Sequence, residues 1–275
     1  MNEHDKQSEF ISSYVDYISK LGEHQKSELY WGTFLANKDR FHSPFYQTYL
    51  TWFVTEGKIN SPYTSIVGWL KILTGKYFRW IYYLLINTFR IFKTRNHIKH
   101  KESIKRKYLK KSITIIKSFS YGHTLTSSGY NDIFFPNVDK WFEESGLETI
   151  TMIDPINDFS KALINIQEID NAFLFHEFTS VLDVLTHFLN CHLAFFQFER
   201  SDRNELDLMA KRQYQVDIFN PILINGALMA ASLEEISKFC DVKNIIHTYE
   251  NISWERTFEL GARKYFPNVK IIGFQ

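Results

Sequence analysis

The stretch IIHTYENISWERTFELGARKYFPNVKIIGFQ, residues 245–275, decides the fold class. It begins with a short apolar run containing β-branched side chains, which is typical of a buried strand in a parallel sheet. After a polar turn, Trp254, Phe258 and Ala262 recur at helical spacing and give the next segment one apolar face. A Pro-Asn pair ends that helix, and the run 269–274 predicts another strand. The stretch therefore predicts a strand, a helix and a strand of an α/β protein.

Polar residues follow the first of these strands. Glu250 and Asn251 come where the strand gives way to a turn, and Ser253 can cap the helix that follows. In open parallel sheets, ligands bind outside the carboxyl ends of the strands. We therefore expect Glu250 and Asn251 to lie at the edge of a cleft, with Trp254 and Glu255 close behind them.

The alternation of strands and helices begins at Ser112. Strands are predicted over 113–121, 148–153 and 172–178, and helices over 136–144, 179–198 and 206–239, the last bent at Pro221. Alternation of this length is typical of a parallel sheet with helices on both faces. The sequence thus predicts a Rossmann-like domain over 112–275.

The amino-terminal region, 1–61, has a helical pattern. Apolar residues follow helical spacing from 8 to 21, and further helices are predicted over 27–35 and 43–53. The last of these is rich in aromatic residues, which we expect to pack between helices rather than to form a binding platform.

The segment 62–111 is unlike the rest of the chain. Its apolar part, 62–92, is interrupted by basic residues, and the uninterrupted run 80–89 is far shorter than the roughly 20 residues that span a bilayer. One reading is a helix lying in the membrane interface, with Arg79 and Trp80 at the lipid headgroups. The alternative is a buried helical hairpin.

A polybasic stretch, 93–111, follows directly. It holds nine Lys and Arg residues and one acidic residue, Glu102. Basic residues beside an apolar segment bind the anionic leaflet of a membrane, so Lys105, Arg106 and Lys107 are candidate membrane-binding residues. Basic runs also bind nucleic-acid phosphates, but no recognition motif for nucleic acid accompanies this one. A solvated linker is the remaining alternative.

Composition limits the class of protein. With 44% hydrophobic and 17% aromatic residues in a chain of 275, general disorder is excluded. The two cysteines, Cys191 and Cys240, form no Cys-x-x-Cys pair, which argues against a disulfide scaffold and suits a reducing cytoplasm. The polar amino terminus lacks the apolar core of a secretory signal. We therefore expect a cytoplasmic protein, peripheral on the inner face of the plasma membrane.

Common cofactor motifs are missing from the sequence. There is no Gly-x-Gly-x-x-Gly after the first α/β strand, no phosphate-binding Walker loop and no His-Glu-x-x-His. His187 and His192 are five residues apart and do not share a helix face well. We expect no metal site and no cofactor bound by this part of the chain.

Three polar groups follow predicted strands and would meet at one sheet edge. They are the loop 121–132, which contains Gly122, His123, Tyr130 and Asp132; the pair His176 and Glu177; and the pair Glu250 and Asn251 with Glu255. Such convergence suggests a cleft for an acceptor substrate.

A reaction in which a substrate hydroxyl attacks an electrophilic carbon needs a base that takes the proton from that hydroxyl. Asp132, Glu250 and His123 are the candidates, in that order. Glu250 has the alternative of holding the turn to Trp254. Glu255 can instead cap its helix, where the dipole favours an anion.

The motifs carry a family resemblance. The segment ENISWE at 250–255, followed by a helix and IIGFQ at 271–275, resembles a segment of bacterial capsule and O-antigen glycosyltransferases. LYWGTFLANK at 29–38 with Ser43, and GYNDIFF at 129–135, are similar to other parts of the same family.

The resemblance implies a fold and an activity. In this family such pieces form the amino-terminal, acceptor-side half of a GT-B enzyme, and a second Rossmann-like half binds the sugar nucleotide. That half is missing from the sequence, so we expect a truncated chain or one half of a split enzyme, with a glycan or lipid-linked acceptor as partner. Two other hypotheses stay open: an inactive membrane-associated interaction domain that needs a partner chain, and a nucleic-acid-binding protein.

Overall fold

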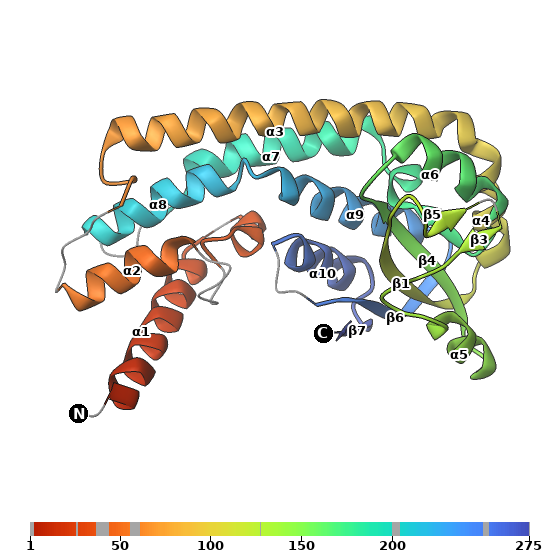
Figure 1. The fold of residues 1–275 in the computed structure, drawn as a ribbon, viewed down its shortest axis with the longest axis horizontal. Coiled ribbons are helices and arrows are strands. Elements are labelled where there is room, and N and C mark those ends of the chain that lie inside the picture. The colour runs from red at the N-terminus through yellow and green to blue at the C-terminus, as the bar shows by residue number, and fades with distance from the viewer. Residues whose placement is uncertain are drawn as a thin grey trace. The chain divides into compact units, whose positions relative to one another are not determined.

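The computed structural model describes residues 3–25, 27–36, 44–55, 61–126, 128–199, 204–249 and 253–274. It confirms the predicted α/β class, with a five-stranded sheet flanked by helices and a helical amino-terminal region (Figure 1). The chain divides into two compact units, called here the helical unit and the sheet unit. The helical unit comprises Met1–Leu84, Leu185–Gly226 and Asn251–Thr257, and the sheet unit comprises Leu85–Val184, Ala227–Glu250 and Phe258–Gln275.

The sheet has a doubly wound strand order. Its strands are β1 (Ser112–Ser120), β4 (Glu148–Pro155), β5 (Ala172–Leu174), β6 (Asp241–Thr248) and β7 (Lys270–Phe274). They run in the order β5-β4-β1-β6-β7, and every neighbouring pair is parallel. The central strand β1 is buried along most of its length. A nearly continuous apolar strand is what burial on both faces requires.

Helices cover both faces of the sheet. On one face, Ile116 of β1 and Ile246 of β6 pack with Phe142 of α5 (Val138–Glu144). On the other face, Met152 of β4 meets Ser232 of α9 (Pro221–Ser237). The ring of His247 on β6 meets Phe258 of α10 (Ser253–Tyr265) on that same face.

Short elements complete the sheet unit. They are η2 (Arg95–His97), α4 (Ile98–Tyr108), the hairpin β2 (Leu125–Thr126) and β3 (Gly129–Tyr130), α6 (Phe159–Asn165), η3 (Ile166–Glu168) and η4 (Phe175–Phe178). The Tyr108 hydroxyl donates to the carbonyl of Thr149 at 2.8 Å, which ties α4 to the sheet. Leu163 and Ile166 join Ile153 of β4 in a buried cluster.

The helical unit is built on aromatic packing. It contains α1 (Glu3–Glu23), η1 (Glu28–Gly32), α2 (Pro44–Val54), α8 (Glu205–Asp217), most of α7 (Val181–Gln197) and the first part of α3 (Ile66–Thr94). Phe10 and Tyr14 of α1 are buried and lie in ring contact with Tyr49 of α2. This confirms the expectation that the amino-terminal aromatics pack between helices.

Two predicted elements differ from the structure. The segment 62–92 is not a hairpin, because α3 is a single helix of 29 residues that runs through Gly75. One glycine lowers helix stability by about 1 kcal/mol, too little to end a long helix. The strand predicted over 172–178 ends at Leu174, whose N–H donates to the Glu177 carboxylate at 2.9 Å and starts a tight helical turn.

Candidate functional site

The sheet has a topological switch point between β1 and β6. From β1 the chain proceeds to β4 and β5 on one side, and later to β6 and β7 on the other. Doubly wound proteins bind ligands at such a place, outside the carboxyl ends of the two strands that flank the switch point. Tyr121, Gly122 and His123 follow β1 at this edge, and Tyr249 follows β6.

The turn after β1 presents His123 to solvent. Thr124 holds this turn: its hydroxyl accepts from the Tyr121 N–H at 2.9 Å and donates to the Tyr121 carbonyl at 3.0 Å. His123 is exposed and stacks against Tyr121, and Gly122 beside it is also exposed. Among the described residues, no heavy atom lies within 4 Å of where a side chain on Gly122 would begin. The turn thus leaves room for a ligand beside an imidazole.

Asp132 lies on a loop fastened to that turn. The Asn131 N–H donates to the Thr124 carbonyl at 2.8 Å. One carboxylate oxygen of Asp132 accepts the N–H groups of Phe134 at 2.9 Å and Phe135 at 3.0 Å. The other oxygen is buried and has no hydrogen-bond partner among the described residues.

Asp132 also lines a small cavity of about 140 Å³. Tyr130, Asp139 and Lys140 line it too, beside the sheet. The Tyr130 hydroxyl lies 2.9 Å from both Ser118 Oγ and the Phe119 carbonyl. Burial, with the nearby charge of Asp132, raises the pKa of Tyr130. Asp132 and His123 are therefore brought to one region, although Asp132 uses one oxygen to hold its own loop.

His176 and Glu177 are buried and engaged inside the sheet unit. Glu177 lies 2.7 Å from His100 Nδ1, and His100 Nε2 donates to the Ile169 carbonyl at 2.8 Å. His176 Nε2 lies 2.9 Å from the side-chain oxygen of Asn87. The expectation that His176 and Glu177 contact substrate is thereby corrected, because packing closes both off from solvent.

Their protonation states follow from these contacts. Burial alone would lower the pKa of His100, but the hydrogen bond and charge of Glu177 outweigh it and raise that pKa above its ordinary value. Burial, with the positive charge of Arg90, lowers the pKa of His176 well below its ordinary value. Glu177 thus favours the charged form of His100, whereas burial favours the neutral form of His176.

The predicted residues after β6 divide into two groups. Glu250 and Asn251 lie outside the described residues. Trp254 and Glu255, in the first turn of α10, are 5% and 1% exposed. The backbone of Trp254 approaches Gly226 within the helical unit. Trp254 and Glu255 are thus parts of the packing of α10, which corrects the expectation that they bind substrate directly.

A buried charged group beneath the switch point was missed from the sequence. Lys117 of β1 and His247 of β6 are partners on adjacent strands, and both are fully buried. Glu259 of α10 lies 3.2 Å from His247 Nε2, and Lys117 Nζ lies 3.1 Å from the ring centroid of Phe119. The sequence signal that could have revealed this group is Lys117 itself, a lysine in the middle of an apolar strand.

The predicted membrane-binding residues have different surroundings. Arg79 is exposed, whereas Trp80 is fully buried and stacks on Phe188 of α7. The expectation that Trp80 contacts lipid is therefore corrected, because Trp80 faces the core of the helical unit. Lys105 lies 3.4 Å from Glu235, and Lys107 lies 3.1 Å from Asp170.

The polybasic stretch is thus neutralised in part by neighbouring acids. Lys101 likewise lies 3.9 Å from Glu235, and Arg106 donates to the carbonyl of Glu102 at 3.3 Å. These contacts leave fewer cations free for a lipid or nucleic-acid phosphate than the sequence suggests.

The described part of the chain has neither a cluster of metal-ligating side chains nor a single helix that could span a membrane. No group of three His, Cys, Asp or Glu side chains in it is arranged to hold a metal ion. No single helix in it is long and apolar enough to cross a membrane, although the bent pair α8 and α9 passes on length and composition when the two are taken together.

The fold and the switch point define a doubly wound α/β protein with a Rossmann-like sheet. No family model matches the chain, and no curated protein or solved structure matches it either.

Proposed function

We propose that the chain is the acceptor-side half of a glycosyltransferase that transfers a sugar from an activated donor to a growing surface polysaccharide at the cytoplasmic face of the membrane. The observation that carries the proposal is the switch point between β1 and β6. It supports a ligand crevice at the edge where His123 is exposed and where β6 ends.

The proposed chemistry needs a base and an acceptor site. His123 or Asp132 takes the proton of the acceptor hydroxyl while its oxygen attacks the anomeric carbon, and the nucleotide leaves with the bonding electron pair. Glu250 is the third candidate base. Gly122 and Tyr130 stand beside these groups and would contact the acceptor. The sugar nucleotide would bind a second α/β half or partner chain.

An activity assay tests this proposal in the complete enzyme, with the donor-side half supplied. Sugar transfer to a lipid-linked acceptor is measured for His123→Gln and Asp132→Asn. Loss of a general base lowers kcat by about 10²–10⁴-fold, and at least one of the two variants should show this loss with little change in KM.

Matched controls are His24→Gln just after α1 and Asp170→Asn before β5, which replace the same residue types outside the segments that follow β1 and β6. They should leave kcat unchanged. Wild-type rates in both His123→Gln and Asp132→Asn would sink the assignment of the base to these two residues.

An inactive interaction domain is the second candidate function. The observation that favours it is that His176, Glu177 and Glu255, expected to bind substrate, are all buried. The two candidates differ in acceptor binding. Titration of the chain with surface oligosaccharides, followed through the His123 ring resonance, should saturate for a transferase half and show no shift for a silent domain.

A further inference from the structure

Helix α3 has its buried and exposed apolar residues on opposite sides. Trp80, Leu84 and Ile91 are buried and follow one another at helical spacing. On the opposite side, Phe78 is 68% exposed and Phe89 is 59% exposed. The outward side also carries Val67, Leu70, Tyr82, Leu85 and Phe92, all more than one-third exposed. A helix of a soluble protein normally presents polar residues there, so this stripe calls for a partner.

Helix α7 carries a second stripe. Leu182, Leu185, Leu189, Leu193 and Phe196 recur at spacings of three or four, and Phe196 is 79% exposed. The inward side of the same helix holds Val184, Cys191 and Ala194, which are buried. Both helices thus carry exposed apolar residues on a side that their own unit leaves open.

The two stripes belong to neighbouring helices. Within the helical unit, Tyr77 of α3 meets His192 of α7, and Trp80 meets His187 and Phe188. Along this contact the residue numbers rise on α3 while they fall on α7, so the two helices are antiparallel. Figure 1 shows them side by side. On α7, the leucine stripe lies next to the side that contacts α3. Phe188 and His192 make that contact, and helical spacing places them on the side of α7 that adjoins the stripe.

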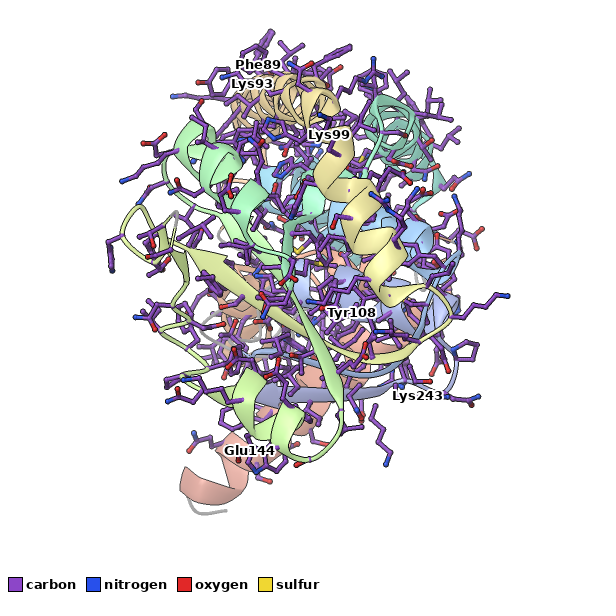
Figure 2. All side chains as sticks on the ribbon, turned by 90° about the vertical axis from the view of Figure 1, so that its right-hand side faces the viewer. Phe89, Lys93, Lys99, Tyr108, Glu144 and Lys243 are labelled. Carbon is purple, nitrogen blue, oxygen red and sulfur yellow. The ribbon has the colours of Figure 1, made fainter. Side chains whose placement is uncertain are left out.

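The edge of α3 that lies away from α7 carries basic side chains and is called here the basic edge. The segment 66–94 contains five Lys and Arg residues and no Asp or Glu. Three cations lie over aromatic rings: Arg79 over Tyr83, Lys93 over Phe89, and Arg95, just past α3, over Phe92. Figure 2 labels Phe89 and Lys93 at the outer edge of α3.

A hollow adjoins this basic edge. It has a volume of about 310 Å³ and is lined by Lys76, Arg79, Tyr83 and Asn225, among others. Two cationic side chains at its wall leave room for a phosphate group beside the apolar stripe.

We propose that the exposed faces of α3 and α7, with the basic edge of α3, dock on an anionic lipid bilayer. The helices would lie in the plane of the membrane, with the aromatic and leucine stripes among the acyl chains and the cations at the lipid phosphates. Charge favours a bilayer over a second copy of the chain, because two α3 faces would bring cations against cations. The inference rests on the proposed membrane location but not on the proposed chemistry, so vesicle binding and sugar transfer can fail independently.

Vesicle flotation of the full chain tests the apolar part. Vesicles of neutral phosphatidylcholine are compared with vesicles that contain one-third phosphatidylserine or phosphatidylglycerol. The wild type should bind the anionic vesicles at least tenfold more tightly. The variant Phe78→Ser/Tyr82→Ser/Phe89→Ser, and separately Leu189→Ser/Leu193→Ser/Phe196→Ser, should each lose at least tenfold in affinity.

The matched control is Trp141→Ser/Ile164→Ser, which removes residues of similar exposure, 61% and 66%, from α5 and α6. It should bind within twofold of the wild type. Circular dichroism checks that each variant is folded, which is expected because every substituted side chain is exposed.

A charge variant separates the basic edge from the stripes. Lys71→Gln/Arg79→Gln should lose the preference for anionic lipid, whereas Lys243→Gln/Lys264→Gln should keep it. Wild-type vesicle binding in both stripe variants would overturn the proposal. A second result would also overturn it: the wild type does not bind vesicles, and it self-associates in sedimentation through contacts that the stripe substitutions abolish. A second copy of the chain would then cover the stripes.

Discussion

Buried histidines in this protein differ in protonation because their neighbours differ. His100 has a carboxylate at 2.7 Å and a carbonyl at 2.8 Å, so its ring is satisfied as a cation. His187 is buried next to the Cys191 sulfur, 3.5 Å away, and burial lowers its pKa to about 4. These residues make stability depend on pH in opposite directions.

Replacing His187 by Leu should remove part of the acid sensitivity. A folded-state pKa of about 4 lies below the unfolded value of about 6.5, so the stability linked to His187 is present above pH 6.5 and is lost as pH falls toward 4. We expect the drop in unfolding free energy between pH 7 and pH 4.5 to shrink by about 2–3 kcal/mol in His187→Leu. Urea titrations at the two pH values measure it.

The exposed Leu189 of the same helix supplies the control, since Leu189→Gln removes no titrating group and should leave that drop as it is in the wild type. An equal drop in the wild type and in His187→Leu would show that His187 is protonated in the folded protein.

Replacing Glu177 by Gln should destabilise the protein most at low pH. The folded-state pKa of His100 is raised, so the stability from the pair is complete below about pH 6.5 and is lost as pH rises through the folded-state pKa. A hydrogen bond to a charged group contributes about 1.5–3 kcal/mol, and Glu177→Gln should cost about that much at pH 5.5. At pH 9 the difference from the wild type should be smaller; a cost that grows with pH would contradict the assignment.

Helix packing rests on small residues at close approaches. A Cβ on Gly261 of α10 would lie 2.4 Å from the Cβ of Ala230 on α9. The two helices meet backbone to backbone there, on the sheet face that holds Lys117 and His247. Gly75 of α3 differs, because among the described residues nothing lies within 4 Å of its Cβ position.

The two glycines should respond oppositely to alanine. Gly261→Ala forces α9 and α10 apart and should destabilise the protein by about 1–3 kcal/mol. Gly75→Ala removes a flexible residue from an open helical position and should stabilise it by up to about 1 kcal/mol. Thermal unfolding of both variants beside the wild type measures the contrast. A neutral Gly261→Ala would show that the α9–α10 contact is loose.

At the scale of the whole molecule, each unit has its own buried thiol. Cys191 belongs to the helical unit and Cys240 to the sheet unit, and both are free and buried. Burial raises the pKa of both thiols, that of Cys240 to about 12, with a further contribution from the charge of Asp241. The thiolate that reacts is therefore rare in the folded state.

Thiol labelling should report the opening of the two units separately. In Cys240→Ser only Cys191 remains, and in Cys191→Ser only Cys240 remains. Each should react at least 100-fold more slowly than an exposed thiol introduced by Ser145→Cys. As denaturant is added, the labelling rate of each thiol should rise at the unfolding midpoint of the unit that contains it. Labelling of Cys191 as fast as that of the exposed thiol would show that the helical unit is not packed as described.

Salt should weaken membrane docking without abolishing it. Raising salt from 0.1 to 1 M shortens the screening length from about 10 to 3 Å. Each Lys or Arg near an anionic surface contributes about 1 kcal/mol, so the exposed Lys71, Arg79 and Arg95 together contribute about 3 kcal/mol, or about 100-fold in affinity. Vesicle flotation at the two salt levels should show a loss of that order, with residual binding from the apolar stripes. Full loss at high salt would mean that the stripes do not enter the lipid.

Local sequence patterns suffice to predict the α/β sheet. Alternating apolar runs and amphipathic segments predict its strands and helices, and the order β5-β4-β1-β6-β7 follows the doubly wound pattern expected of them. The turn containing Gly122 and His123 lies at the predicted sheet edge. Lys117 was missed because its burial depends on the neighbouring strands β4 and β6, which lie far along the chain.

The sequence by itself determined the class of fold and the location of the polar turns. Both depend on the spacing of apolar and polar residues within short segments. Only the tertiary structure decided which side of each segment is buried. Trp80 is enclosed while Phe78 and Tyr82 are open, since α7 sets the rotation of α3. Glu177 is paired with His100, 77 positions away, and is not free to contact a ligand. A buried charge requires a partner, and the local sequence pattern does not reveal which distant residue that partner is.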